Sequence, residues 1–135
     1  MYVACGRCPA CVGGDHRRCS KFQMFGMGVA FGNLAGGQAE YVRVPLADMT
    51  LRAIPEGLSD ESTIFTGDIL ATAFSALRQS GIVEGDTIAI VGAGPLGQLI
   101  AMCAPIFGAG LVFVIDVVED RLAEVERFGA IAIDP

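Results

Sequence analysis

The chain of 135 residues is poor in basic side chains and has a single histidine. Nine lysines and arginines stand against fifteen acidic residues, so the formal net charge is −6 at pH 7. Because there is no basic stripe to neutralise phosphates, we expect no nucleic-acid partner. The first residues, MYVACGRCPAC, contain no apolar signal region, so we expect a cytoplasmic protein. Internal repeats and low-complexity tracts are also absent from the sequence.

Hydrophobic residues are abundant, at 53% of the chain. This share predicts a globular core and excludes a disordered chain. The length suits one ordinary domain or parts of two.

The clearest pattern runs from residue 87 to Asp116. An apolar, β-branched run over residues 87–91 predicts a buried parallel strand, and the turn G-x-G-x-x-G follows it. A helical pattern comes next, with an apolar face of Leu96, Leu99, Ile100, Cys103 and Phe107. A second apolar run over residues 111–115 ends at Asp116, about 20 residues after the last glycine of the turn. This order predicts an α/β fold with a Rossmann-type parallel sheet and flanking helices.

The same order indicates dinucleotide binding. Gly92 allows the tight turn, Gly94 lets the backbone approach a pyrophosphate, and Gly97 lets the helix lie against the strand. The helix N-terminus offers N–H groups to the phosphates, and the carboxylate binds the ribose hydroxyls. The predicted cofactor-binding residues of this stretch are Gly92, Gly94, Pro95, Leu96, Gly97 and Asp116.

Two other interpretations of this stretch remain open. Residues 87–115 contain no charge and are long enough to span a membrane, but glycines and prolines interrupt them where a βαβ unit needs its turns. We therefore expect no membrane association. The second alternative is a βαβ unit that binds no ligand. Pro105 falls within the helical pattern, so the helix must end or kink there.

Four of the five cysteines lie in the first 19 residues, with the spacing C-x2-C-x2-C-x7-C. Four thiolates this close in sequence can surround one tetrahedral ion, and a closed site of this kind is structural. Zinc is the favoured metal, on Cys5, Cys8, Cys11 and Cys19. An iron–sulfur cluster or a disulfide is the alternative, although the last spacing and the missing proline depart from the ferredoxin pattern. His16 could replace a cysteine, but a solvated loop histidine is the simpler interpretation.

The other patterns predict secondary structure around these motifs. We expect strands over 38–45 and 51–54, a turn and helix start over 56–61, a buried helix over 64–79, a helix over 119–128 and a third parallel strand from 130 to 133. Asp68 is a carboxylate within the apolar helix pattern, where burial is costly unless it is paired or bound to a cation. An N-cap or first-turn acid assisted by Thr66 is the alternative. Cys103 is expected to be a small core residue.

Together these parts resemble the zinc-containing medium-chain alcohol dehydrogenases. The cysteine quartet resembles their structural-zinc lobe, GGQAEYVRVP their GG-x-AEY strand, and the glycine turn with Asp116 their coenzyme fingerprint. The segment PLADMTLRAIPEGLSDESTIFTGDILATAFSAL is similar to the formaldehyde-dehydrogenase-like branch. The resemblance implies a partial GroES-like catalytic domain over residues 1–62 and the first half of a Rossmann domain over residues 63–135.

The resemblance also implies the chemistry: hydride transfer between a small alcohol or aldehyde and NAD, with a structural and a catalytic zinc. Asp68 takes the position of the third catalytic-zinc ligand, and Thr72 that of a threonine beside the nicotinamide. Asp116 favours NAD, because a carboxylate repels the 2′-phosphate of NADP. NADP remains the alternative coenzyme, because the positively charged Arg121 is near in sequence. The full-length protein is expected to be a homo-oligomer.

One departure from the family pattern is important. The other catalytic-zinc ligands of the family, a cysteine and a histidine, precede the structural-zinc loop, and here that loop begins at Cys5. We therefore expect an internal fragment of a longer dehydrogenase that does not oxidise alcohols alone. The competing class is a non-catalytic module that binds zinc and a nucleotide.

Overall fold

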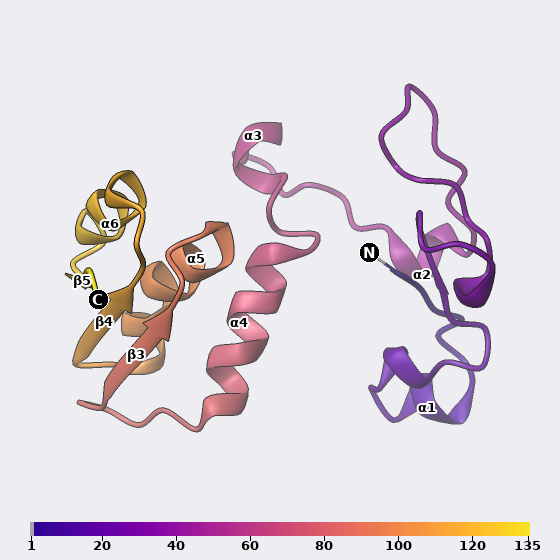
Figure 1. Ribbon diagram of the computed structural model, residues 1–135. Helices are drawn as coiled ribbons and strands as arrows, with labels where there is room; N and C mark the ends of the chain where they lie inside the picture. The colour runs from indigo at the N-terminus through magenta and orange to yellow at the C-terminus, as the bar shows by residue number, and fades with distance from the viewer. Residues whose placement is uncertain (1) are drawn as a thin grey trace. The chain divides into compact units, whose positions relative to one another are not determined.

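A computed structural model describes residues 2–135. The chain divides into two compact units, one ending at Gly57 and the other beginning at Leu58 (Figure 1). Each unit is described by itself below.

The first unit contains little regular structure. Strand β1 (Tyr2–Val3) pairs antiparallel with β2 (Gln23–Met24). Between and after them lie the short helices α1 (Pro9–Val12) and α2 (Ala47–Thr50) and the 3₁₀ turns η1 (His16–Arg18) and η2 (Val29–Phe31). The buried residues are few: Val3, Ala4, Cys11, Cys19 and Leu34. Since two of these five are cysteines, apolar packing alone supplies little of the stability of this unit.

The two strands predicted in this unit do not form. Residues 38–45 and 51–54 are irregular, and Tyr41 is 92% exposed. The alternation of residues 38–45 predicted a half-exposed strand, but residues 38–43 are all exposed. Neither segment pairs with another strand in residues 2–135, so the backbone groups that a strand must satisfy have no ladder to join.

The second unit is built on a parallel sheet. Strands β3 (Thr87–Val91), β4 (Leu111–Ile115) and β5 (Ile131–Ile133) follow one another in the order β3-β4-β5. Helix α5 (Pro95–Cys103) connects the first pair and α6 (Glu119–Glu126) the second, and Leu122 and Val125 of α6 are buried. The predicted strand, helix, strand, helix, strand order and the α/β fold class are confirmed.

Helix α5 buries its smallest residues. Gly97, Ala101 and Cys103 are buried, whereas Leu96 is 38% exposed, so the predicted apolar face is only partly right. Small side chains bring the helix backbone close to the strands. The α-helix ends before Pro105, as that proline requires, and a 3₁₀ turn η3 (Ala104–Phe107) leads into the left-handed Gly108.

Two helices precede the sheet. Helix α3 (Asp60–Thr63) begins at the predicted place, where the Ser59 hydroxyl accepts from the Ser62 amide at 3.2 Å. Helix α4 (Ile69–Ser80) begins five residues later than predicted, after a turn over residues 64–68, and ends at the left-handed Gly81. Only Ala73 and Leu77 of α4 are buried, so the prediction of a buried helix is wrong.

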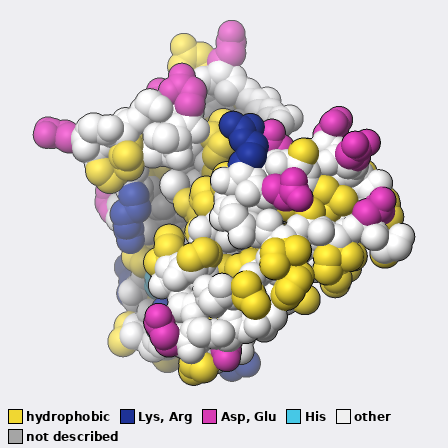
Figure 2. Space-filling model, turned by 90° about the vertical axis from the view of Figure 1, so that its left-hand side faces the viewer, with side chains coloured by type: hydrophobic (Ala, Val, Ile, Leu, Met, Phe, Trp, Pro, Cys, Tyr) yellow, Lys and Arg dark blue, Asp and Glu magenta, His cyan; other side chains and the backbone are white. Residues whose placement is uncertain are grey.

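Apolar surface remains uncovered on the second unit. Within the described chain, β3 and β5 each have one neighbouring strand, and Val91 and Ile131 are 85% and 44% exposed. On the face shown in Figure 2, hydrophobic side chains gather in patches between polar groups and backbone. Either edge can therefore accept a further strand. None of the helices in residues 2–135 has the length and apolar character needed to cross a membrane.

The contact between Gly97 and Gly92 leads to a stability prediction. A Cβ at position 97 would collide with the carbonyl oxygen of Gly92, and backbone cannot move aside cheaply. Gly97→Ala should therefore lower the free energy of unfolding by about 1–3 kcal/mol, measured by urea unfolding. Gly94→Ala is the matched control, because a Cβ there meets nothing within 4 Å, and its loss should stay below about 1 kcal/mol. Equal losses in the two variants would contradict the prediction.

Candidate functional site: a cysteine cluster and a glycine turn

The four N-terminal cysteines meet in one cluster. Their Sγ atoms all lie within 4.8 Å of one another. Cys5 follows β1, Cys8 is the N-cap of α1, Cys11 lies inside α1 and Cys19 ends η1. The left-handed Gly6, with φ of +71°, turns the chain between the first two. The predicted constellation is therefore brought together by short local turns.

The cluster suits a single tetrahedral ion. Zinc–sulfur bonds of about 2.3 Å place sulfurs about 3.8 Å apart, which is compatible with the observed limit. All four thiols are free rather than joined in disulfides. The amides of Cys5 and Lys21 donate to the Cys19 sulfur at 3.2 and 3.3 Å, an arrangement that stabilises a thiolate and orients a metal ligand. A cluster of several irons would need its ligands further apart.

The sulfurs differ in acidity. The backbone N–H groups of Cys11 and Ser20 lower the pKa of the Cys8 thiol to about 6, while burial raises the pKa of the Cys11 thiol to about 12. The pKa of Cys5 is lowered, mainly by the backbone N–H of Arg7. Since metal ligation requires thiolates, a metal entering at neutral pH must displace the proton of Cys11 but finds Cys8 ionised.

His16 does not join the cluster. It begins the turn η1, and the ligand group identified among residues 2–135 consists of cysteines alone. The fifth cysteine, Cys103, is buried in α5, and burial raises its pKa, as a core residue requires.

The glycine turn connects β3 to α5. Gly92 has φ of +99°, a conformation that favours glycine, and its amide donates to the Ile115 carbonyl at 2.7 Å. Gly97 is required by its contact with Gly92. Gly94, the N-cap of α5, has φ of −68°, and a Cβ on it would enter open space. Nothing within the described chain therefore requires glycine at position 94.

Asp116 lies beside this turn, at the end of β4. Its Oδ2 accepts from the Ala93 amide at 2.6 Å, and its Oδ1 accepts from the amides of Val117 and Val118 at 2.7 and 3.0 Å. Arg121 lies 3.9 Å from Oδ2. The pKa of Asp116 is lowered, chiefly by the Ala93 N–H, so the carboxyl group is ionised at neutral pH. The glycine turn and Asp116 lie together, as predicted. The sequence analysis did not identify Ala93 as a hydrogen-bond donor to Asp116, because a backbone N–H leaves no signal in the sequence.

Asp68 and Thr72 lie at the start of α4 and are both exposed. The exposed position means that Asp68 does not bear the cost of burial. Asp68 occupies the N-cap position, but its side chain makes no capping hydrogen bond, and the Thr66 hydroxyl donates instead to the Thr63 carbonyl. Over residues 2–135, Asp68 belongs to no group of three or more potential metal ligands.

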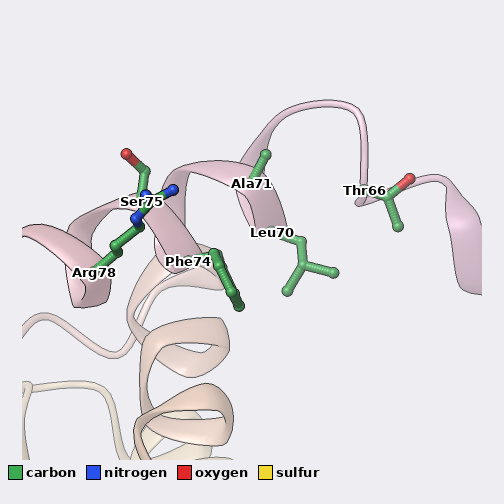
Figure 3. Close-up of a pocket in the computed structure, with 6 residues that line it drawn as sticks. All are labelled: Thr66, Leu70, Ala71, Phe74, Ser75 and Arg78. Atoms are coloured by element: carbon green, nitrogen blue, oxygen red, sulfur yellow. The ribbon is translucent and has the colours of Figure 1, made fainter. Parts of the chain in front are cut away.

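An open, mostly apolar groove follows one side of α4 (Figure 3). Its lining consists of Thr66, Leu70, Ala71, Phe74, Ser75 and Arg78. Phe74 also contacts the ring of Phe107 edge to face, with centroids 4.7 Å apart. None of the predicted site residues lines this groove.

Comparisons with known proteins place these features in one class. No family model matches the chain. Over 98% of its length it is 38% identical to a medium-chain reductase/dehydrogenase of Acremonium and 33% identical to a zinc-type alcohol dehydrogenase-like protein of Schizosaccharomyces pombe. Over 94% it is 37% identical to a glutathione-independent formaldehyde dehydrogenase of Bacillus subtilis. The chain spans 46%, 35% and 33% of these three proteins.

The solved structures most relevant here are dehydrogenases, like the sequence relatives. The alcohol dehydrogenase of Thermus sp. ATN1 matches 98% of the chain with a TM-score of 0.93 and 41% identity, over 39% of its own length. A dehydrogenase from Sinorhizobium meliloti bound to NADP and one from Escherichia coli bound to NADH match with TM-scores of 0.79 and 0.78, at 31% and 28% identity, over 99% and 98% of this chain and 37% of each of theirs.

The fold and the two motifs thus define an α/β class in which a partial GroES-like unit with a four-cysteine cluster precedes a partial Rossmann sheet. More particularly, the chain is similar over nearly its whole length to zinc-type medium-chain alcohol dehydrogenases, and it corresponds to part of the length of these relatives.

The cluster leads to a metal-binding prediction. Cys8→Ser should reduce the zinc content from about one ion per chain to a small fraction of that, because three thiolates and a hydroxyl bind zinc far more weakly. Elemental analysis after dialysis against a weak chelator measures it. Cys103→Ala is the control, since this thiol lies outside the cluster, and should retain the metal. Full zinc content in Cys8→Ser would contradict the assignment.

Proposed function

We propose that the whole protein is an NAD-dependent, zinc-containing alcohol dehydrogenase that transfers hydride between a small alcohol or aldehyde and NAD. The observation that carries the proposal is the meeting of the Asp116 carboxylate with the glycine turn at Ala93, at 2.6 Å. This places the acid that would hold a ribose next to the backbone that would hold a pyrophosphate.

The three glycines of the turn support a bound dinucleotide in different ways. Backbone conformation accounts for Gly92 and close packing accounts for Gly97. Neither reason applies to Gly94, whose missing side chain leaves open space at the N-terminus of α5. A pyrophosphate lying against this backbone, with Pro95 and Leu96 in the first turn of the helix, accounts for the third glycine.

Asp116 supports NAD over NADP. Its side chain is 10% exposed and ionised at neutral pH, so a 2′-phosphate beside it would be repelled. Arg121 offers the opposite charge, but it lies 3.9 Å from Asp116 and is already part of that ion pair. Since one structural relative is bound to NADP and another to NADH, family membership does not decide the coenzyme.

For the metals, we propose a structural zinc on Cys5, Cys8, Cys11 and Cys19. A catalytic zinc, when bound, would act as the Lewis acid that stabilises an alkoxide. We propose Asp68 as one of its ligands and Thr72, one helical turn later, as a neighbour of the nicotinamide. The exposure of both side chains leaves them available for these contacts.

We further propose that residues 1–62 belong to the catalytic domain and residues 63–135 to the first half of the coenzyme domain. A homo-oligomeric, cytoplasmic protein is part of the same proposal. The second candidate is a non-catalytic module that binds zinc and a nucleotide, for which the closed four-sulfur cluster would be sufficient, because such a cluster leaves no position for substrate. Two zinc ions per subunit of the whole protein would support the enzyme, and one would support the module.

The coenzyme preference is directly measurable. NAD should bind at least about tenfold more tightly than NADP, because the phosphate would face an ionised carboxylate. Isothermal titration calorimetry of the zinc-loaded protein with each coenzyme gives the two dissociation constants. Tighter binding of NADP would refute the assignment.

The open space at Gly94 leads to a second binding prediction. Gly94→Ala should weaken NAD binding by about tenfold or more, since its methyl group would occupy space assigned to the pyrophosphate, without a matching loss of stability. Gly36→Ala is the control, because a Cβ there also meets nothing within 4 Å and the residue lies outside the turn. Unchanged NAD affinity in Gly94→Ala would exclude the proposed pyrophosphate position.

A further inference from the structure

The Asp116 carboxylate has more protein partners than a ribose-binding acid requires. A carboxylate has about four lone-pair positions. Three are taken by the amides of Ala93, Val117 and Val118, and Arg121 lies beside the fourth.

These partners are of two kinds. Val117 and Val118 directly follow Asp116, so their amides form a local turn around Oδ1. Ala93 lies 23 residues away in sequence, at the centre of the glycine turn, and is fully buried. Its amide is the one donor that connects the carboxylate to another segment of the backbone.

The turn is held on both sides of Ala93. The Gly92 amide donates to the Ile115 carbonyl at 2.7 Å, so β4 fixes the residue before Ala93. On the other side, the side-chain amide of Gln98 donates to the Ala93 carbonyl at 3.0 Å. The Ala93 N–H faces Asp116, and without that acceptor it would be a buried donor with no partner, which is unfavourable.

We propose that Asp116 is a positioning residue for the glycine turn: through the Ala93 amide it holds the turn in the shape that receives a pyrophosphate, independently of any ribose contact. This inference rests on the proposed dinucleotide function. It predicts that removing the carboxylate weakens binding even of a nucleotide that has no ribose hydroxyls for Asp116 to bind.

The experiment uses the full, zinc-loaded chain and two nucleotides, ADP and 2′,3′-dideoxyADP, whose ribose lacks both hydroxyls. In Asp116→Asn, one oxygen cannot serve both Ala93 and the local turn, and Asp116→Ser keeps a local acceptor but is too short to reach Ala93. In both variants the dissociation constant of dideoxyADP should rise about tenfold. Asp120→Asn is the control, because it removes an exposed charge on α6 and should leave binding unchanged.

Amide hydrogen exchange tests the contact without any ligand. In ligand-free protein, the Ala93 amide should exchange about tenfold or more faster in Asp116→Ser than in the unchanged chain, while buried amides of β4 keep their protection. Unchanged exchange at Ala93, or a loss of affinity for ADP alone, would overturn the proposal. If the unchanged chain binds neither nucleotide, the proposed function fails, and the exchange rates still decide whether Asp116 holds the turn.

Discussion

The second unit depends on the close approach of α5 to the end of β3. This approach is possible because Gly97 has no side chain to strike the Gly92 carbonyl, and the small side chains of Ala101 and Ala104, further along the chain, are also buried. Because the helix packs so closely, its N-terminus lies beside the carboxyl end of the sheet. There β4 ends next to β3, and Asp116 reaches the turn. The geometry of the candidate coenzyme site thus follows from one contact between backbones.

The first unit cannot be stabilised mainly by apolar packing. It has two-residue strands, two short helices and a small core in which cysteines occupy part of the buried space. A metal ion bound by the four cysteines would add to the stability of a unit with so little apolar burial, because the free energy of metal binding is also free energy of folding. The raised pKa of Cys11 and the lowered pKa of Cys8 show that the metal-free thiols are unequal, and one ion would make all four thiolates.

Much of the second unit was predictable from local patterns. The strands at 87–91 and 111–115, the turn between them and the helix end before Pro105 each depend on residues near in sequence. The predictions were wrong where contacts between residues distant in the sequence determine the secondary structure. The alternation at 38–45 predicted a strand without a partner, and the apolar run from 64 predicted a buried helix, although α4 begins at Ile69 and leaves Phe74 half exposed. The hydrogen bond from the Ala93 amide to Asp116 could not be predicted either, because it joins residues distant in sequence and every residue except proline has a backbone N–H.

The two candidate metal positions also differ in whether residues near in sequence are enough to form them. The cysteine cluster is complete within residues 5–19, so local turns suffice to assemble it, and spacing alone predicted it. A single exposed carboxylate such as Asp68 cannot define a metal site, because zinc needs three or four ligands and the others must come from elsewhere. Its position before α4 is suited to such a role: the backbone carbonyl of Asp68 begins the helix by accepting from Thr72, and no hydrogen bond within residues 2–135 engages its side chain. A carboxylate at the N-cap of a helix, with no capping bond to break, can enter a coordination sphere without loss of that bond.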